Sequence, residues 1–249
     1  MKLFGLVGHP LGHSFSKRYF SNKFATLQLD CEYRNFDLDN IAQIKTILCE
    51  YPEILGFNVT IPYKEAILRY LDELDTTAEQ VGAVNTVKIL SDGRLKGFNT
   101  DVVGFETIIK SVIASDKKAI PALILGTGGA AKAVRYVLEK NNIPYHLVSR
   151  DPQKGDFTYE TLKEKDILRH LLIINTTPVG MSPKVDEAPP IPYQAIDKRH
   201  TLIDLIYNPE ETLFLSKSRK HGALTLNGMS MLHAQAEASW NCWTNNLIE

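Results

Sequence analysis

One short segment constrains the fold of this chain more than any other: a glycine-rich turn between an apolar strand and a helix. The sequence PALILGTGGAAKAVRYVLEK, residues 121–140, contains the pattern G-x-G-x-x-A from Gly126 to Ala131. Gly126 permits a tight turn, Gly128 lets the backbone approach a pyrophosphate, and Ala131 lets the helix pack closely on the strand. Because the strand precedes the turn and the helix follows it, we interpret the motif as a dinucleotide-binding site, with a plain tight turn as the alternative.

The end of the next strand indicates which dinucleotide to expect. An NAD site usually has an acidic residue about 20 residues after the glycine turn, whereas an arginine there can hold the 2′-phosphate of NADP. This chain has Ser149-Arg150-Asp151, followed by Lys154. Arg150 favours NADP because its guanidinium can make charge-assisted contacts with phosphate, whereas Asp151 would repel the phosphate unless its side chain points away. We expect NADP as the cofactor. Two alternatives stay open: NAD could be the cofactor, or Arg150 could be a solvent-exposed residue at the end of a strand that binds no phosphate.

Composition excludes several classes of protein. The chain has 249 residues, 44% of them hydrophobic and 23% charged, which is typical of a globular protein of one or two domains. A formal net charge of -1 gives no reason to expect nucleic acid or a membrane surface as a partner. Cys31, Cys49 and Cys242 show neither disulfide-framework nor zinc-site spacing. No apolar run resembles a signal peptide or a membrane span, so we expect a cytoplasmic protein.

The first hundred residues predict an α/β domain. Strand-like and helix-like segments alternate in the βαβαβ rhythm of a parallel sheet. A hairpin is predicted around Asp92-Gly93, and a helical turn around Thr77 to Val81. The alternating segments are KLFGLVG, SKRYFSNKFATLQL, CEYRNFDL, NIAQIKTILCE and ILGFNVT.

The remainder of the chain predicts a second α/β unit. A helix over residues 102–115 connects to the glycine-turn segment, and LLIINT and TLIDLIY add two buried-strand patterns. Residues 178–192 are rich in proline and predict an irregular stretch. A last helix, from about Met229 to Asn245, carries Trp240 and Trp243 along an apolar seam, where we interpret them as packing residues.

The segment FNVTIPYKE, residues 57–65, contains a lysine in an unusual place. Residues 57–61 predict a strand that Pro62 ends, and a helix is predicted near residues 63–71. Lys64 would then be a cation at a helix N-terminus, where the macrodipole favours an anion. Local rules that fail in one spot often mark a functional site.

Other polar side chains are scattered along the chain, each with a structural alternative. Serines cap helices, asparagine and aspartate occupy turns, and glutamine is common at surfaces. His9 and His13 are four residues apart but lie in a loop rich in proline and glycine, so we assign no metal. The candidates for a site are Ser14, Ser16, Thr60, Asn85, Asp101 and Gln235.

Taken together, these segments resemble the shikimate dehydrogenase family. The resemblance spans nearly the whole chain, and the motifs occur in the family's order. They are GHPLGHSFSK, NVTIPYKE, GAVNT, GFNTD, GTGGAAKA, NTTPVGM, DLIYNPEET and GMSMLHAQA.

The resemblance implies an α/β fold of two domains with a cleft between them. Residues 1–101 would form a substrate-binding domain with a mostly parallel sheet, completed by the C-terminal helix, residues 229–249. Residues 102–228 would form a Rossmann-like NADP-binding domain. The family reduces 3-dehydroshikimate to shikimate with NADPH, a reversible hydride transfer in the chorismate pathway to aromatic amino acids.

The resemblance also implies roles for individual residues. Lys64 and Asp101 match the catalytic pair. The family's Asn-Arg-Thr after the second strand is replaced here by Ser149-Arg150-Asp151, a departure that weakens the case for strict NADP use. The positions that match substrate-binding residues are Ser14, Ser16, Thr60, Asn85, Tyr207 and Gln235. The positions that match the cofactor site are Gly126, Gly128, Gly129, Ala130, Ser149, Arg150, Lys154, Met181 and Gly228.

Three other functions remain open at this level. A quinate/shikimate dehydrogenase would accept a wider range of substrates and use NAD or NADP. Methylenetetrahydrofolate dehydrogenase is another two-domain enzyme, but the NVTIPYK and MLHAQA segments argue against it. A non-catalytic metabolite-binding regulator would not need both Lys64 and Asp101. For partners we expect a small-molecule substrate, with a monomer or a homodimer left open.

Overall fold

The computed structural model describes residues 1–12, 14–112 and 121–244, together with the backbone of residue 113. The chain divides into two compact units. Unit 1 comprises Met1–Thr100 with Gln235–Glu249, and unit 2 comprises Asp101–Ala234. The predicted helix ends at residues 115 and 245, the final residues 245–249, and His13 lie outside the described residues. No helix in the described part of the chain is long and apolar enough to cross a membrane.

Unit 1 is built on a six-stranded mixed sheet. Its strands are β1 (Lys2–Gly8), β2 (Cys31–Asp37), β3 (Ile54–Val59), β4 (Glu73–Leu74), β5 (Thr86–Ile89) and β6 (Leu95–Phe98). Their order in the sheet is β2-β1-β3-β5-β6-β4. β1 pairs in parallel with both β2 and β3, as the alternating pattern predicts. β5 and β6 form the predicted antiparallel hairpin, whose turn contains Gly93 at φ +85°.

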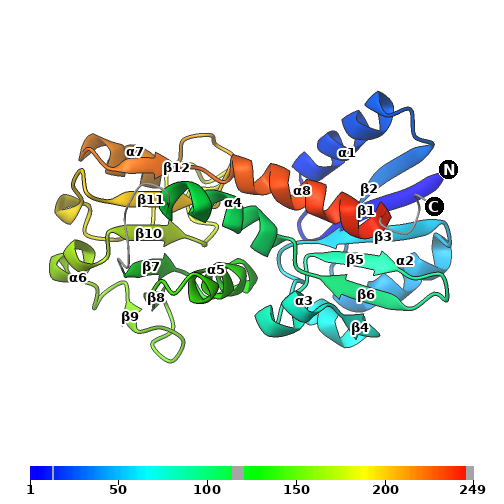
Figure 1. Cartoon of the computed structure of the whole chain (residues 1–249), viewed down its shortest axis with the longest axis horizontal. Coiled ribbons are helices and arrows are strands. Elements are labelled where there is room, and N and C mark those ends of the chain that lie inside the picture. The colour runs from blue at the N-terminus through cyan, green and yellow to red at the C-terminus, as the bar shows by residue number, and fades with distance from the viewer. Residues whose placement is uncertain (13, 114–120, 245–249) are drawn as a thin grey trace. The chain divides into compact units, whose positions relative to one another are not determined.

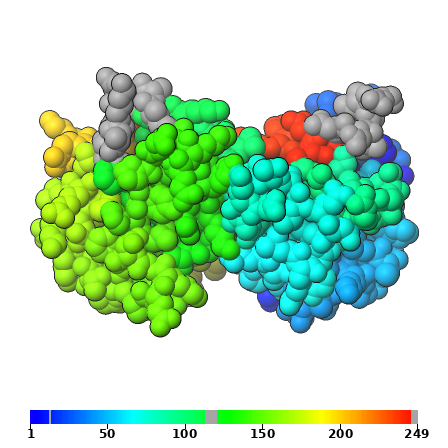
Figure 2. Space-filling model, turned by 60° about the horizontal axis from the view of Figure 1, so that its bottom comes forward, coloured from blue at the N-terminus to red at the C-terminus, as the bar shows by residue number. Residues whose placement is uncertain are grey.

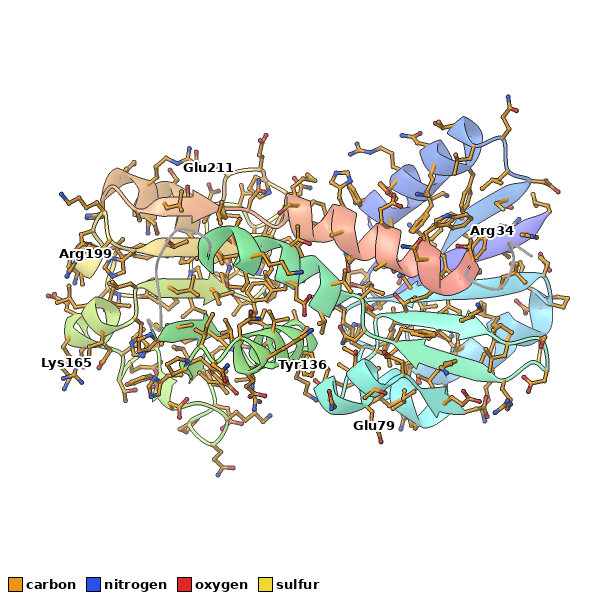
Figure 3. All side chains as sticks on the ribbon, in the orientation of Figure 1. Arg34, Glu79, Tyr136, Lys165, Arg199 and Glu211 are labelled. Carbon is orange, nitrogen blue, oxygen red and sulfur yellow. The ribbon has the colours of Figure 1, made fainter. Side chains whose placement is uncertain are left out.

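Helices cover both faces of this sheet (Figure 1). On one face, α1 (Phe15–Thr26) and α8 (Met229–Thr244) pack on Phe4 and Tyr33. Trp243 is 1% exposed in this core and its indole donates to the Val87 carbonyl at 2.9 Å, which confirms it as a packing residue. The elements on the opposite side are η1 (Ile41–Gln43), α2 (Ile44–Glu50), η2 (Ala66–Tyr70) and α3 (Thr76–Val81). The core on that side includes Phe57, and Glu79 is exposed on α3 (Figure 3).

The predicted helix near residues 63–71 is wrong in its extent. Pro62 lies in a turn, and only Ala66–Tyr70 is helical, as the short 3-10 helix η2. The turn is closed by the Tyr63 N–H, which donates to the Thr60 carbonyl at 2.9 Å. The buried Tyr63 side chain donates its hydroxyl to the Leu38 carbonyl, so a tertiary contact fixes the turn and displaces the regular helix. Lys64 is therefore not the first residue of a helix, and the helix dipole no longer makes its position unusual.

Unit 2 is built on a six-stranded parallel sheet. Its strands are β7 (Ala122–Leu125), β8 (Tyr145–Ser149), β9 (Phe157–Thr158), β10 (Leu172–Asn175), β11 (Thr201–Asp204) and β12 (Leu224–Leu226). Their order, β12-β11-β10-β7-β8-β9, is that of a doubly wound dinucleotide-binding fold. In such folds, ligands bind outside the carboxyl ends of the strands where the order reverses, and here the reversal occurs between β7 and β10.

Helices also cover both faces of the sheet in unit 2. α4 (Asp101–Ile113) and α5 (Gly129–Lys140) lie side by side in front of the strands in Figure 1. The core on the other side contains Leu123 and Phe214. Residues 178–192 hold no helix or strand, as predicted. The elements of that second core are α6 (Glu164–Arg169), η3 (Tyr193–Ala195) and α7 (Leu213–Lys220).

Candidate functional site

In unit 1, the turn after β3 fixes the backbone of Lys64. The Thr60 N–H donates to the Val7 carbonyl at 2.9 Å, which ties the start of the turn to β1. The Lys64 carbonyl accepts from the Val84 N–H at 2.8 Å, which ties its end to the segment before β5. The Lys64 side chain is half-buried. In Figure 2, cyan marks the part of the sequence of unit 1 in which this segment lies.

The serines of the N-terminal loop lie at the start of α1. The Ser14 hydroxyl accepts from the Lys17 N–H at 3.1 Å and caps the helix. Helix capping, the structural alternative given for Ser14, is therefore confirmed as one role of this side chain. Ser16 lies beside the Tyr33 hydroxyl, and burial raises the pKa of Tyr33 well above its usual range. Tyr33 in turn donates to Asn58 Oδ1 at 2.8 Å, so Ser16 is connected to β3.

Asn85 and Gln235 are brought together from distant parts of the sequence. Asn85 is 2% exposed, and its Oδ1 accepts from the backbone N–H of Thr100 at 2.7 Å. Its Nδ2 donates to Gln235 Oε1 at 3.1 Å. A backbone N–H can only donate, so the Thr100 contact fixes which atom of the Asn85 amide is oxygen. Gln235 is therefore a half-buried member of a bonded pair and not a surface residue.

Asp101 is the residue that follows Thr100 and the first residue of α4. It is 2% exposed. The structural alternative for Asp101, a place in a turn, is therefore replaced by a helix start, where an acidic side chain complements the macrodipole.

In unit 2, the glycine turn has the backbone conformation that the motif predicts. Gly126 lies at φ +106°, in the region that favours glycine. A Cβ there would lie 2.8 Å from Thr176 Oγ1, which itself donates to the Leu125 carbonyl at 2.7 Å. A Cβ on Gly128 would meet nothing within 4 Å, and Gly128 caps α5 without a side-chain hydrogen bond. Gly129 and Ala130 open α5, so their N–H groups lie at a helix start that can receive an anion.

At the carboxyl end of β8 the cation of Arg150 is exposed, whereas the carboxylate of Asp151 binds groups of its own loop. Arg150 is exposed, whereas Ser149 is 5% exposed and accepts from the Asp151 N–H at 3.1 Å. Asp151 Oδ1 accepts from the Gln153 N–H at 3.0 Å, and Oδ2 lies 3.6 Å from Lys154 Nζ. Both oxygens of the Asp151 carboxylate thus have partners within their own loop.

The remaining predicted residues of unit 2 lie in loops. Met181 is 39% exposed, and its N–H donates to the Pro178 carbonyl at 3.1 Å. Tyr207 is half-buried. Gly228 is packed against the segment after β11, because a Cβ there would lie 2.1 Å from the Leu205 carbonyl oxygen.

Sequence reasoning missed the side chains that hold Asn85 and Gln235 in place. Asn58, Thr86 and Thr100 lie inside or beside motifs quoted above, so their position next to candidate residues was a usable signal. For Ser239 the only signal was its helical spacing, since it lies four residues after Gln235. All four belong to a buried hydrogen-bond network in unit 1.

Comparison with known proteins agrees with this arrangement. Residues 6–87 match the family model described as the shikimate dehydrogenase substrate binding domain. A shikimate dehydrogenase (NADP(+)) from Methanococcus maripaludis strain C6 is 41% identical over 261 residues, covering 98% of this chain and 91% of the relative. The chain belongs to the shikimate dehydrogenase family.

Solved structures of family members have the same fold. Shikimate 5-dehydrogenase from Thermus thermophilus, in complex with NADP(H) and shikimate, is 30% identical with a TM-score of 0.84, covering 98% of this chain and 94% of that one. Quinate dehydrogenase from Corynebacterium glutamicum, in complex with NAD, is 28% identical with a TM-score of 0.86 and the same coverage. The α/β fold with a Rossmann-like unit is therefore confirmed.

Proposed function

We propose that this chain is an NADP-dependent shikimate dehydrogenase that interconverts 3-dehydroshikimate and shikimate. Unit 1 binds the substrate and unit 2 binds the cofactor. The observation that carries the proposal is the pairing of Asn85 with Gln235 in a chain whose relatives are shikimate dehydrogenases (NADP(+)). The pair gives the family's substrate-binding amides a defined orientation.

Lys64 is the residue we assign to proton transfer. Reduction of a ketone builds negative charge on its oxygen, and a lysine ammonium can meet that charge and donate a proton. In the reverse direction the same nitrogen takes the hydroxyl proton. Asp101 is assigned to the same step as the acidic partner of the catalytic pair.

Ser14, Ser16, Thr60, Asn85 and Gln235 are the groups we assign to substrate recognition. Shikimate carries one carboxylate and several ring hydroxyls, which neutral hydroxyl and amide groups can satisfy by hydrogen bonds. An analogue that lacks a hydroxyl would leave buried site groups unpaired, and it would be rejected for that reason.

The residues of unit 2 fit NADP. The open face of Gly128 leaves room for the pyrophosphate, and the start of α5 offers N–H groups to it. The exposed Arg150 is suited to the 2′-phosphate, with Lys154 nearby in the same loop. Ser149, Met181, Tyr207 and Gly228 remain assigned to the cofactor or substrate through the family. When bound, NADPH supplies the hydride.

The test is a set of four rate measurements. Shikimate and quinate are each oxidised with NADP+ and with NAD+, and the absorbance of the reduced cofactor is followed. We expect the shikimate–NADP+ pair to give the largest kcat/KM. No activity with any pair would overturn the proposal and favour a metabolite-binding regulator.

A second candidate is a dehydrogenase that also oxidises quinate with NAD+. It is favoured by the likeness to the Corynebacterium glutamicum quinate dehydrogenase and by Asp151, a carboxylate at the place where NAD sites carry one. In the same four measurements, a rate with quinate and NAD+ comparable to that with shikimate and NADP+ would establish this broader enzyme.

A further inference from the structure

Ser239 lies at the centre of the buried network in unit 1. It is on α8, four residues after Gln235, and is 0% exposed. Its hydroxyl donates to the Gln235 carbonyl at 2.9 Å, and its oxygen accepts from Asn58 Nδ2 at 2.9 Å. The hydroxyls of Thr86 and Thr100 lie 2.8 and 3.1 Å from the same oxygen. One side chain therefore ties α8 to β3, to β5 and to the segment after β6.

The protons of this network can be assigned. Ser239 has one hydroxyl proton, and that proton is used by the Gln235 carbonyl. The oxygen of Ser239 can then only accept, as it does from Asn58 Nδ2. Asn85 Oδ1 lies 3.1 Å from both Thr86 Oγ1 and Thr100 Oγ1 and is an acceptor for their hydroxyl protons. Every hydroxyl proton in the cluster has an acceptor.

The network fixes the orientation of the two amides. Asn85 Oδ1 accepts from the Thr100 N–H, and Asn85 Nδ2 donates to Gln235 Oε1. The Gln235 amide therefore has its oxygen toward Asn85 and its Nε2, which can only donate, at the other end. A hydroxyl or carbonyl oxygen of a ligand can accept from this Nε2.

We propose that Ser239 is a positioning residue that holds the Gln235 turn of α8 in the register where Gln235 Oε1 accepts from Asn85 and Gln235 Nε2 is offered to the substrate. Ser239 acts through Gln235 and Asn85 and does not itself touch the substrate. The inference rests on the proposed function, because the substrate is the one assigned above.

The test compares Ser239→Ala with Ser218→Ala. Ser218, on α7 of unit 2, is also 0% exposed and also donates to the carbonyl four residues before it, at 2.7 Å, so it is a matched control outside the network. We expect Ser239→Ala to raise KM for shikimate roughly 5- to 10-fold, the loss of about one hydrogen bond, with kcat and KM for NADP+ nearly unchanged. Ser218→Ala leaves all three constants unchanged.

Two further variants separate positioning from a general packing defect. In a Gln235→Ala background, Ser239→Ala should add no further increase in KM, because the two residues act as one unit. Gln235→Glu keeps an acceptor for Asn85 and replaces the substrate-facing N–H groups by oxygen, so it should raise KM for shikimate at least as much as Gln235→Ala. Should Ser239→Ala fail to fold, Thr86→Val removes a hydroxyl of the same network and is read in the same way.

The outcomes are distinct. The inference is overturned by an unchanged KM for shikimate in folded Ser239→Ala. It is also overturned if the KM increases of Ser239→Ala and Gln235→Ala multiply in the double variant. Either result leaves the proposed function standing. A Gln235→Glu variant with the wild-type KM overturns the donor assignment. A wild-type chain that does not oxidise shikimate overturns the proposed function and the inference with it.

Discussion

In unit 1 the groups assigned to the substrate are held by other side chains, whereas in unit 2 most groups assigned to the cofactor are held by the backbone. Asn85 and Gln235 depend on a buried network that joins residues up to 181 positions apart. The glycine turn is a local strand–turn–helix, and Arg150 is exposed at the end of the next strand. The difference suits the ligands, because a small polyol is distinguished by its hydroxyls and a dinucleotide by its phosphates.

The largest effect is expected for Lys64, the residue of unit 1 that we assign to proton transfer. Lys64→Ala should lower kcat roughly 10²- to 10⁴-fold, the usual contribution of a positioned acid or base, with KM for shikimate changed less. Steady-state kinetics measure this effect. Lys88→Ala, at another half-buried lysine of unit 1, is the control and should retain kcat. Near-full kcat in Lys64→Ala would remove Lys64 from the chemical step.

The next largest effect tests the side-chain network. Asn85→Ala should raise KM for shikimate roughly 10- to 100-fold and lower the free energy of unfolding by about 1–3 kcal/mol, because the buried Thr100 N–H loses its acceptor. The control is Asn99→Ala, since Asn99 is 4% exposed and donates to the Ala83 carbonyl at 2.8 Å. That variant should lose stability without changing KM. An equal KM increase in both variants would mean that burial, and not recognition, explains the effect.

A smaller and more selective effect is expected in unit 2. Arg150→Ala should raise KM for NADPH roughly 10-fold, while KM for NADH and the unfolding midpoint stay near the wild type, because an exposed arginine makes one charge-assisted contact to the 2′-phosphate. Arg169→Ala, at an exposed arginine on α6, serves as the control. Equal increases for both cofactors would show that Arg150 does not contact the 2′-phosphate.

The smallest effect concerns stability alone. His170 is 4% exposed and its Nε2 lies 2.8 Å from His146 Nδ1, and burial is the main cause that lowers the pKa of His170. The neighbouring His146 and Arg169 lower that pKa further, whereas Asp166 raises it. Because the folded pKa lies below the unfolded value of about 6.5, the stabilisation is present above that value and is lost as the pH falls through the folded pKa.

The measurement is the unfolding midpoint in denaturant between about pH 7 and pH 5, a window that follows from the unfolded value. The wild type should lose stability on acidification more steeply than His170→Gln. His221→Gln, at an exposed histidine of unit 2, should follow the wild type. Identical slopes in the wild type and His170→Gln would contradict the assignment, and KM for shikimate should not respond to His170→Gln at all.

Most of the fold could be predicted from the sequence because its signals are local. The alternation of apolar strands and amphipathic helices indicated both sheets, and Gly126 with Gly128 marked the turn after β7. The failure at residues 63–71 has a physical cause: the Tyr63 hydroxyl and the Lys64 carbonyl are bound by partners 20 or more residues away along the chain. Local propensity does not include such contacts.

The site divides in the same way. Most of the cofactor residues lie in two short segments, 126–130 and 149–154, so a motif identifies them, whereas Met181 and Gly228 were named through the family resemblance. Asn85 and Gln235 were among several scattered polar candidates, and only the family resemblance assigned them to one site, since no spacing rule connects positions 150 residues apart. Ser239 escaped detection because a serine on an amphipathic helix is ordinarily a surface or back-bonding residue.

Hydrogen exchange of the full-length chain, with shikimate and with NADP+ in separate samples, tests the division between the units most directly. We predict that shikimate protects amides of residues 57–65, 84–86 and 235–239, all in unit 1, and that NADP+ protects residues 126–131 and 149–154, all in unit 2. Protection of the glycine turn by shikimate, or of the Asn85 segment by NADP+ in its place, would contradict this account.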